Sequence, residues 1–319
     1  MPPCPSVLEA NRPPAIKSMK PKDIAAFVFL AVTWGLSFLV LLKVVHAFGW
    51  IGAVTLRSLI AGITLLLLAA ATRRRLDFSA GWRRFAMVGA TTVAAQLIGL
   101  SYATPRIGTA MAAILVAAIP LFSMIIGQVW GLERITARGL AGLLLGAAGI
   151  MVLVGFPSVP VTASFVFGCA ASLFSSFSAA FGSNYANRHL RSVGTLEVTS
   201  AAFLFGGLMT LPLLLAVPIP AMPSAVDFLY LTILACVMSA MTYVVYFRLD
   251  ASIGATRTIS VEFAVTVIAV LVGTVMLKEP LTVIQAVGAV AIIGGCVFVL
   301  DPFPRRLKAV PLPSAPPLV

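Results

Sequence analysis

The sequence predicts an all-α membrane protein with ten transmembrane helices, arranged as two inverted repeats of five helices each. Of the 319 residues, 60% are hydrophobic and 10% are charged, too few polar side chains to cover a water-soluble protein of this length. The mean hydropathy is +1.07. Apolar runs long enough to cross a membrane recur along the whole chain. The third observation is an internal duplication with a period of 146 residues.

The duplication is clearest between residues 107–155 and the stretch 146 positions later. Residues 133–136, Glu-Arg-Ile-Thr, align with residues 279–282, Glu-Pro-Leu-Thr. Each copy consists of an apolar helix, a tight charged turn and a second apolar helix rich in glycine. A repeat at a fixed period indicates two copies of one structural unit.

In chain order, residues 1–22 are expected to form a cytoplasmic tail, residues 23–156 the first repeat, residues 163–301 the second, and residues 302–319 a second cytoplasmic tail. The ten spans follow from apolar length. They are 24–44, 50–71, 84–104, 107–130, 137–156, 163–186, 195–217, 225–248, 254–277 and 281–300. Short connections between them predict antiparallel neighbours and leave no room for a separate soluble domain.

Five spans per repeat is an odd number, so the second repeat runs through the membrane in the opposite sense to the first. Placing both termini in the cytoplasm puts 18 Lys and Arg residues inside and three outside, with Arg57 within a span. Cytoplasmic loops carry an excess of these residues. The sequence therefore predicts a multi-pass protein of the cell (inner) membrane. Inverted repeats are typical of secondary transporters, whose substrate site lies near the membrane midplane between the halves.

Several other classes of protein are disfavoured. The net charge of +12 fits membrane orientation better than nucleic-acid binding. The four cysteines and two histidines have no metal-ligand spacing, so neither a metal nor a cofactor is expected. No P-loop occurs, so ATP is not the direct energy source. An intramembrane hydrolase would need a second catalytic group near Glu262, and a scaffold or receptor would need more extramembrane surface. The sequence predicts a transporter and not an enzyme.

Candidate cavity residues are polar or aromatic side chains within spans. Trp34 lies about ten residues into the first span, near the midplane, with Ser37 one turn on. The sixth span contains Ser175 and Ser178, which can line a cavity or join helices. Gln96 and Tyr243 are further candidates, in the third and eighth spans.

Two ionisable residues lie within spans. Glu262 is roughly 12 Å from the inner end of the ninth span, too deep for its side chain to reach water easily. An ionisable residue at that depth indicates a functional site. It can carry protons, bind a substrate amine or bond a neighbouring helix. Arg57 is about 10 Å from the outer face and can either extend towards water or pair with Glu262.

The conspicuous turn glutamates, Glu133 and Glu279, are interpreted as structural. Each ends one helix and can reach the amides that open the next, where a negative charge is favoured. Thr282 to Gln285 forms a predicted capping box. Four glycines share one face of the fifth span, at positions 139, 142, 146 and 149. That face is expected to pack within the bundle, with dimerisation as the alternative.

Four stretches of the sequence carry motifs of one transporter family: residues 34–38, Trp-Gly-Leu-Ser-Phe; residues 56–58, Leu-Arg-Ser; and residues 108–136 and 254–282. They resemble the EamA-type, ten-helix branch of the drug/metabolite transporter superfamily. The first is similar to the family's Trp-Gly-x-x-Phe opening and the second to its Leu-Arg-Phe, with Ser58 in place of Phe. The last two resemble its fourth and ninth spans with the turns that follow them. The ninth span has Thr266 where the family usually has proline. The resemblance implies a ten-helix bundle that exports metabolites, amino acids or drugs.

The expected partners are a small-molecule substrate, the lipid bilayer and protons, and both a monomer and a homodimer remain open. Apart from Glu262 and Arg57, the interior is neutral, aromatic and hydroxyl-bearing, and a multiply charged solute would lack counter-charges there. Neutral or zwitterionic metabolites, amino acids first, are therefore the expected substrates. Multidrug or toxic-cation efflux is the alternative.

The charge distribution generates a topology prediction. A reporter that is active only in the cytoplasm, fused after Val319, should be active, because both termini are expected there. The same reporter fused within the connection between the first two spans should be inactive. Activity only of a periplasmic reporter at Val319 would contradict the predicted orientation.

Overall fold

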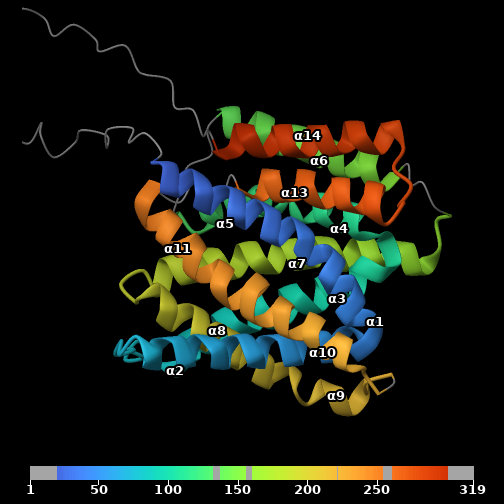
Figure 1. Cartoon of the computed structure of the whole chain (residues 1–319). Coiled ribbons are helices and arrows are strands. Elements are labelled where there is room, and N and C mark those ends of the chain that lie inside the picture. Colours follow the sequence, from blue (N-terminus) through green and yellow to red (C-terminus); the bar gives the residue numbers. More distant parts are fainter. Residues whose placement is uncertain (1–19, 132–136, 156–159, 221, 254–260, 301–319) are drawn as a thin grey trace, which may run out of the picture.

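The computed structural model consists of helices joined by short connections and contains no strand among the residues it describes. It describes residues 20–131, 137–155, 160–220, 222–253 and 261–300. The start of α1 (Pro21–Ala71) and the end of α14 (Val283–Leu300) lie at the same end of the helical bundle, as Figure 1 shows.

The remaining helices of the first half are α2 (Trp82–Val88), η1 (Gly89–Ala95), α3 (Gln96–Ile107), α4 (Thr109–Val116), α5 (Ile119–Val129) and α6 (Ala137–Gly155). Those of the second half are α7 (Ala163–His189), α8 (Thr195–Thr210), α9 (Leu213–Ala216), α10 (Ala225–Thr232), η2 (Ile233–Met241), α11 (Thr242–Ile253), α13 (Val261–Leu271) and η3 (Val272–Met276). The three segments labelled η are π-helical. The α helices and π segments follow one another without a break in 82–107 and 225–253.

Helix α1 contains the first two predicted spans. Its 51 residues leave helical geometry at Gly49, where φ is 72° and ψ is 166°. A positive φ is accessible to glycine at little cost. A Cβ at this position would also lie 3.3 Å from Cδ of Pro220. Gly49 therefore separates the two spans where the sequence predicted their connection.

The structure supports a membrane protein but does not confirm the predicted number of spans. Among the described residues, six helical segments are long and apolar enough to cross a membrane. Shorter apolar helices occupy Ala137–Val152, Ala264–Met276 and Val283–Gly295. The prediction of ten transmembrane helices is thus not confirmed by length and hydropathy and stays a prediction.

The duplication is visible in the positions of the helices. A shift of 146 residues carries α3 onto α11, and carries the start of α6 at Ala137 onto the start of α14 at Val283. The same shift places the π segment η1 within η2. Segment η1 ends directly before α3, and η2 ends directly before α11, the helix that matches α3. The two copies therefore share local backbone geometry as well as sequence.

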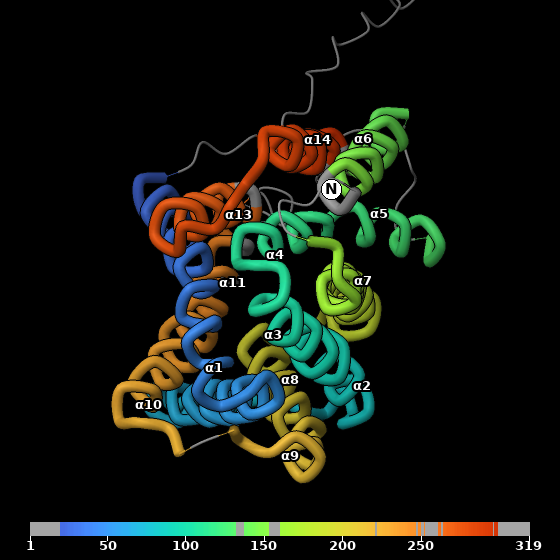
Figure 2. Tube along the Cα trace, turned by 90° about the vertical axis from the view of Figure 1, so that its right-hand side faces the viewer, coloured from blue at the N-terminus to red at the C-terminus, as the bar shows by residue number. Residues whose placement is uncertain are grey.

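Glycines of the fifth predicted span pack against another helix of the same bundle, which was the expected use; dimerisation was the alternative. A Cβ at Gly149 would lie 2.7 Å from the carbonyl oxygen of Gly288. A Cβ at Gly295 would lie 2.5 Å from the carbonyl oxygen of Gly142 and 2.6 Å from the amide nitrogen of Gly146. Helices α6 and α14 lie side by side at one edge of the bundle, as Figure 2 shows. The glycine face joins the last helix of one half to the last helix of the other.

The two copies differ where the sequence departs from the family pattern. In the first half, α4 ends at Val116 and α5 begins at Ile119, with Pro120 in its first turn. In the second half, α13 continues through Thr266, whose hydroxyl donates to the carbonyl oxygen of Glu262 at 2.9 Å. Proline ends or bends a helix because it lacks an amide hydrogen and its ring is bulky. With threonine in place of proline, the helix does not break at that position.

The Glu279 turn is structural, as predicted, but its carboxylate caps a different helix from the expected one. Oε1 accepts hydrogen bonds from the amide and hydroxyl of Thr109 at 2.7 and 2.9 Å, and Oε2 accepts one from the amide of Ala110 at 2.9 Å. The capped helix is α4, in the other half. Thr282 and Gln285 form the predicted capping box at α14 by themselves. Glu133 lies outside the described residues.

The α6–α14 contact predicts a difference between two neighbouring glycines. Gly295→Ala should lower the stability of the protein by about 1–3 kcal/mol, because its methyl group would overlap backbone atoms of α6. Gly294→Ala is the matched control, since a Cβ there would meet Cδ2 of Leu145 at an ordinary 3.6 Å. Thermal unfolding in detergent compares the two, and equal melting temperatures would contradict the packing.

The Glu279 contact predicts a second effect on stability. Glu279→Gln should cost about 1–3 kcal/mol, because charge-assisted hydrogen bonds at the start of α4 are lost and an amide group faces backbone donors. Lys278→Gln alters a neighbouring exposed charge and should leave the melting temperature unchanged. A Glu279→Gln protein as stable as this control would show that the cap contributes nothing.

Candidate functional site

The candidate site is built around Trp34, on the first part of α1. Its indole Nε1 donates to the hydroxyl of Thr242 at 3.0 Å, and its ring lies 5.8 Å from that of Tyr243 and 5.5 Å from that of Tyr246. The indole is thus fixed by α11 at its polar end and bounded by two phenol rings. Trp34 comes from the first half of the chain and its partners from the second, so the site lies between the halves.

Close backbone contact holds α1 in this position. A Cβ at Gly35 would lie 2.5 Å from Cγ2 of Ile268 on α13. Ser37 is half-buried, and its hydroxyl donates to the carbonyl oxygen of Trp34 at 2.7 Å. The hydroxyl hydrogen of Ser37 is therefore committed to its own helix, which leaves the oxygen as an acceptor.

Arg57 reaches the same site from the second part of α1. It is 8% exposed, and its Nε donates to the hydroxyl of Ser239 in η2 at 2.8 Å. The guanidinium interacts electrostatically with Tyr243. The expectation that Arg57 extends towards water is therefore wrong, because its side chain is held inside the bundle by η2.

Glu262 lies in the first turn of α13 and is partly buried. It also interacts electrostatically with Tyr243, so Tyr243 is within the field of both a cation and a carboxylate. Among the residues that the structure describes, the ion pair within 4 Å is Arg74 with Glu197, and Arg57 and Glu262 do not form one. The possible direct pairing of Arg57 with Glu262 is not found.

The other predicted site residues meet at a different interface. The hydroxyl of Ser175 donates to the backbone carbonyl oxygen of Gln96 at 2.8 Å, which joins α7 to α3. Ser178 is buried on the same helix, α7. A Cβ at Gly99 would lie 2.6 Å from the carbonyl oxygen of Ala171, so the two helices are in close backbone contact. Of the seven predicted residues, Trp34 and Tyr243 are in ring contact, Glu262 interacts electrostatically with Tyr243, and Ser175 bonds the backbone of Gln96.

Sequence reasoning missed three members of the site. Ser239 and Thr242 each accept a hydrogen bond from the polar end of a buried side chain, and Phe203 of α8 packs edge-on against Tyr243 with ring centroids 5.3 Å apart. Serine and threonine in an apolar helix carry little signal of their own. Their closeness to Tyr243 in the sequence was the available clue. The π-helical geometry of η2 changes which of its residues share a helix face with Tyr243, so helical spacing alone did not identify them.

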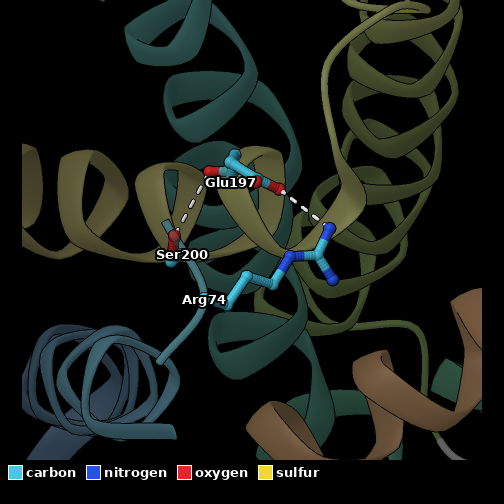
Figure 3. A network of polar contacts seen from close by, with 3 residues as sticks. All are labelled: Arg74, Glu197 and Ser200. Atoms are coloured by element: carbon cyan, nitrogen blue, oxygen red, sulfur yellow. Dashed lines mark hydrogen bonds and ion pairs between the residues drawn. The ribbon is translucent and has the colours of Figure 1, made fainter. Parts of the chain in front are cut away.

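A second polar region lies at the loop end of the bundle where α2 and α8 begin. Glu197 lies in the first turn of α8 and is buried, and its Oε2 is 3.8 Å from Nη2 of Arg74. The hydroxyl of Ser200 donates to the backbone carbonyl oxygen of Glu197 (Figure 3). A pocket of about 270 Å³ lies nearby, lined by residues that include Asp77, Arg84, His189 and Ser192. The amide of Ser79 donates to the Asp77 carboxylate and lowers the pKa of that carboxyl. This pocket is separate from the Trp34 site.

The chain is similar to curated proteins over most of its length. It is 27% identical to Protein PecM of Dickeya dadantii over 300 residues, which cover 92% of this chain and 97% of that protein. It is 26% identical to the uncharacterized inner membrane transporter YedA of Escherichia coli K12 over 268 residues, 82% of this chain and 84% of that one. An uncharacterized transporter of Archaeoglobus fulgidus is 23% identical and covers 86% of this chain and 98% of its own.

A solved crystal structure shares the fold, with a TM-score of 0.65 and 18% sequence identity over 88% of this chain and 99% of that one. The model of the EamA-like transporter family matches twice, at residues 22–155 and 166–301. These matches and the names of the relatives indicate a membrane transporter with a small-molecule substrate, and not an enzyme. The chain belongs to the EamA-like transporter family.

Proposed function

We propose that this protein is a secondary transporter that exports small neutral or zwitterionic metabolites, with amino acids as the leading class. The observation that carries the proposal is the partly buried group of Trp34, Arg57, Tyr243 and Glu262 between the two halves. Its walls are aromatic and hydroxyl-bearing, and it holds one cation and one carboxylate. A multiply charged solute would find too few counter-charges in such a site.

The position of this site supports transport by alternating access. Its residues come from both family-matched ranges, and a site between two halves can be opened by rocking one half against the other. The contacts of Glu279 with α4 and of Arg74 with Glu197 also join the two ranges. In the proposed cycle each of these contacts breaks when the transporter opens at that end. Both termini are proposed to be cytoplasmic.

Efflux of toxic cations or drugs is the second candidate. It is favoured by the aromatic rings of Trp34, Tyr243 and Tyr246, since aromatic faces attract cations, and by the carboxylate of Glu262. The buried charge of Arg57 argues against a cationic solute in the same site. A monomer or a homodimer is compatible with both candidates.

Protons are the proposed driving ion, and Glu262 is the residue proposed to carry them. A carboxylate within a membrane span can be protonated when the site faces one side and release its proton when it faces the other. Its electrostatic interaction with Tyr243 would couple its charge to the occupancy of the site.

The test is transport by the purified protein in liposomes against a panel of amino acids and cationic drugs. Glu262→Gln keeps the shape of the side chain but cannot titrate. Under proton coupling it should abolish accumulation driven by a pH gradient and leave solute exchange near the wild-type rate. Asp77→Asn, which removes an exposed loop carboxylate, should change neither.

If Glu262→Gln weakens exchange as well, and most for cationic solutes, the carboxylate binds the substrate amine directly. A Glu262→Gln protein with wild-type rate and pH dependence would contradict both roles. Absence of transport of every solute in the panel by the wild-type protein would contradict the proposed function.

A further inference from the structure

Arg57 is a buried cation whose described protein contacts leave its charge uncompensated. It lies eight residues beyond Gly49, about 12 Å along the second part of α1, and is 8% exposed. Removing a charged side chain from water costs several kcal/mol unless an opposite charge is supplied nearby. Among the described residues no carboxylate lies within 4 Å of its guanidinium, and its hydrogen-bond partner is the neutral Ser239.

The hydrogen bond to Ser239 uses only the Nε atom of the Arg57 guanidinium. The Ser239 hydroxyl donates its own hydrogen to the carbonyl oxygen of Leu234 at 2.7 Å, so towards Arg57 it can only accept. It accepts from Nε, the nitrogen nearest the side-chain stem. The two terminal nitrogens, which together carry four N–H groups, remain as the binding edge.

Aromatic and ionisable side chains lie close to Ser239, the residue that binds Arg57. One turn beyond Ser239, Thr242 anchors the indole of Trp34, and the next residue, Tyr243, interacts electrostatically with both Arg57 and Glu262. The rings of Trp34 and Phe203 pack against Tyr243, and the ring of Tyr246 packs against Trp34. Tyr243 thus interacts electrostatically with one cation and one carboxylate and packs against two aromatic rings.

We propose that Arg57 is the residue that binds the carboxylate of the transported solute, and that a free carboxylate is therefore required for tight binding. This rests on the proposed transport function and narrows its substrate class to solutes that carry one carboxylate. The planar guanidinium fork matches a carboxylate through two parallel hydrogen bonds, which an ammonium or a neutral amide does not reproduce. The apolar part of the solute would lie against Trp34.

Ser239 is a positioning residue in this arrangement. Because it holds Nε, it aims the terminal nitrogens without contacting the solute itself. Its placement depends on the π-helical turn of η2, in which its hydroxyl reaches the carbonyl five residues earlier. Such insertions in a helix often occur at functional sites.

The first test uses the unaltered full-length protein in liposomes, so it does not depend on whether a variant folds. Radiolabelled L-amino acids are the transported probes. Each transported one is challenged with its unlabelled free acid, its methyl ester and its decarboxylated amine. The free acid should compete at least about tenfold better than the ester and the amine, as the loss of a charged bidentate contact requires. Equal competition by all three would overturn the assignment of Arg57 while leaving the transport function standing.

The second test varies the site. Arg57→Gln should raise the KM for the free acid about tenfold or more and leave the KM for the amine unchanged or lower. The KM of Arg57→Lys for the free acid should lie between those of Arg57→Gln and wild type, because lysine keeps the charge but lacks the planar guanidinium. Ser239→Ala should raise the KM for the acid less than Arg57→Gln does. Arg106→Gln removes an equal charge beside Tyr102 at the far end of α3 and should behave as wild type.

Monodisperse elution in detergent and the melting temperature identify variants that fail to fold. A folded Arg57→Gln protein with wild-type KM for the free acid, or with equal losses for acid and amine, would overturn the inference. Transport of amines or esters in preference to acids by the wild-type protein would do the same and favour cation efflux. If no member of the panel is transported, the proposed function itself fails and the inference fails with it.

Discussion

Helices in lipid cannot associate by burying apolar surface, because the lipid chains are as apolar as the side chains, and this constraint governs the whole structure. What remains is close approach of backbones and hydrogen bonds between helices. The glycines follow this rule: a Cβ at Gly62 would meet Leu204, one at Gly99 would meet the backbone of Ala171, and one at Gly295 would meet the backbone of α6. At each of these three contacts the helices approach closely because one residue has no side chain.

The candidate site depends on departures from this regular packing. The backbone leaves α-helical geometry at Gly49, between α4 and α5, and in the π segments, and η2 contains Ser239 and is followed directly by Thr242. In lipid an irregular backbone is tolerated where it is buried in protein or lines a cavity. The site therefore combines a regular scaffold, which fixes α1 and α13, with a locally altered helix that redirects side chains towards Arg57.

The sequence predicted the parts of this fold that depend on local pattern and on duplication. The apolar ranges, the break near Gly49, the glycine face of α6 and the cap at Thr282 all depend on residues close together in the chain. The partner of Glu279 could not be predicted in this way, because 170 residues separate it from Thr109. Of the candidate site residues, Trp34, Tyr243 and Glu262 were predicted from their polar or aromatic character within apolar spans. The orientation of Arg57 was not, since it depends on how α1 and η2 are rotated against each other.

The cap on α4 has a consequence for the synthesis of the protein. Thr109 and Ala110 are made long before Glu279, whose carboxylate their amides bind. Translation at about 5–20 residues per second separates the two by roughly ten to thirty seconds. During that interval the start of α4 has to rely on water or the insertion machinery for its hydrogen bonds. Until residue 279 is made, the start of α4 therefore lacks the carboxylate that caps it in the folded protein.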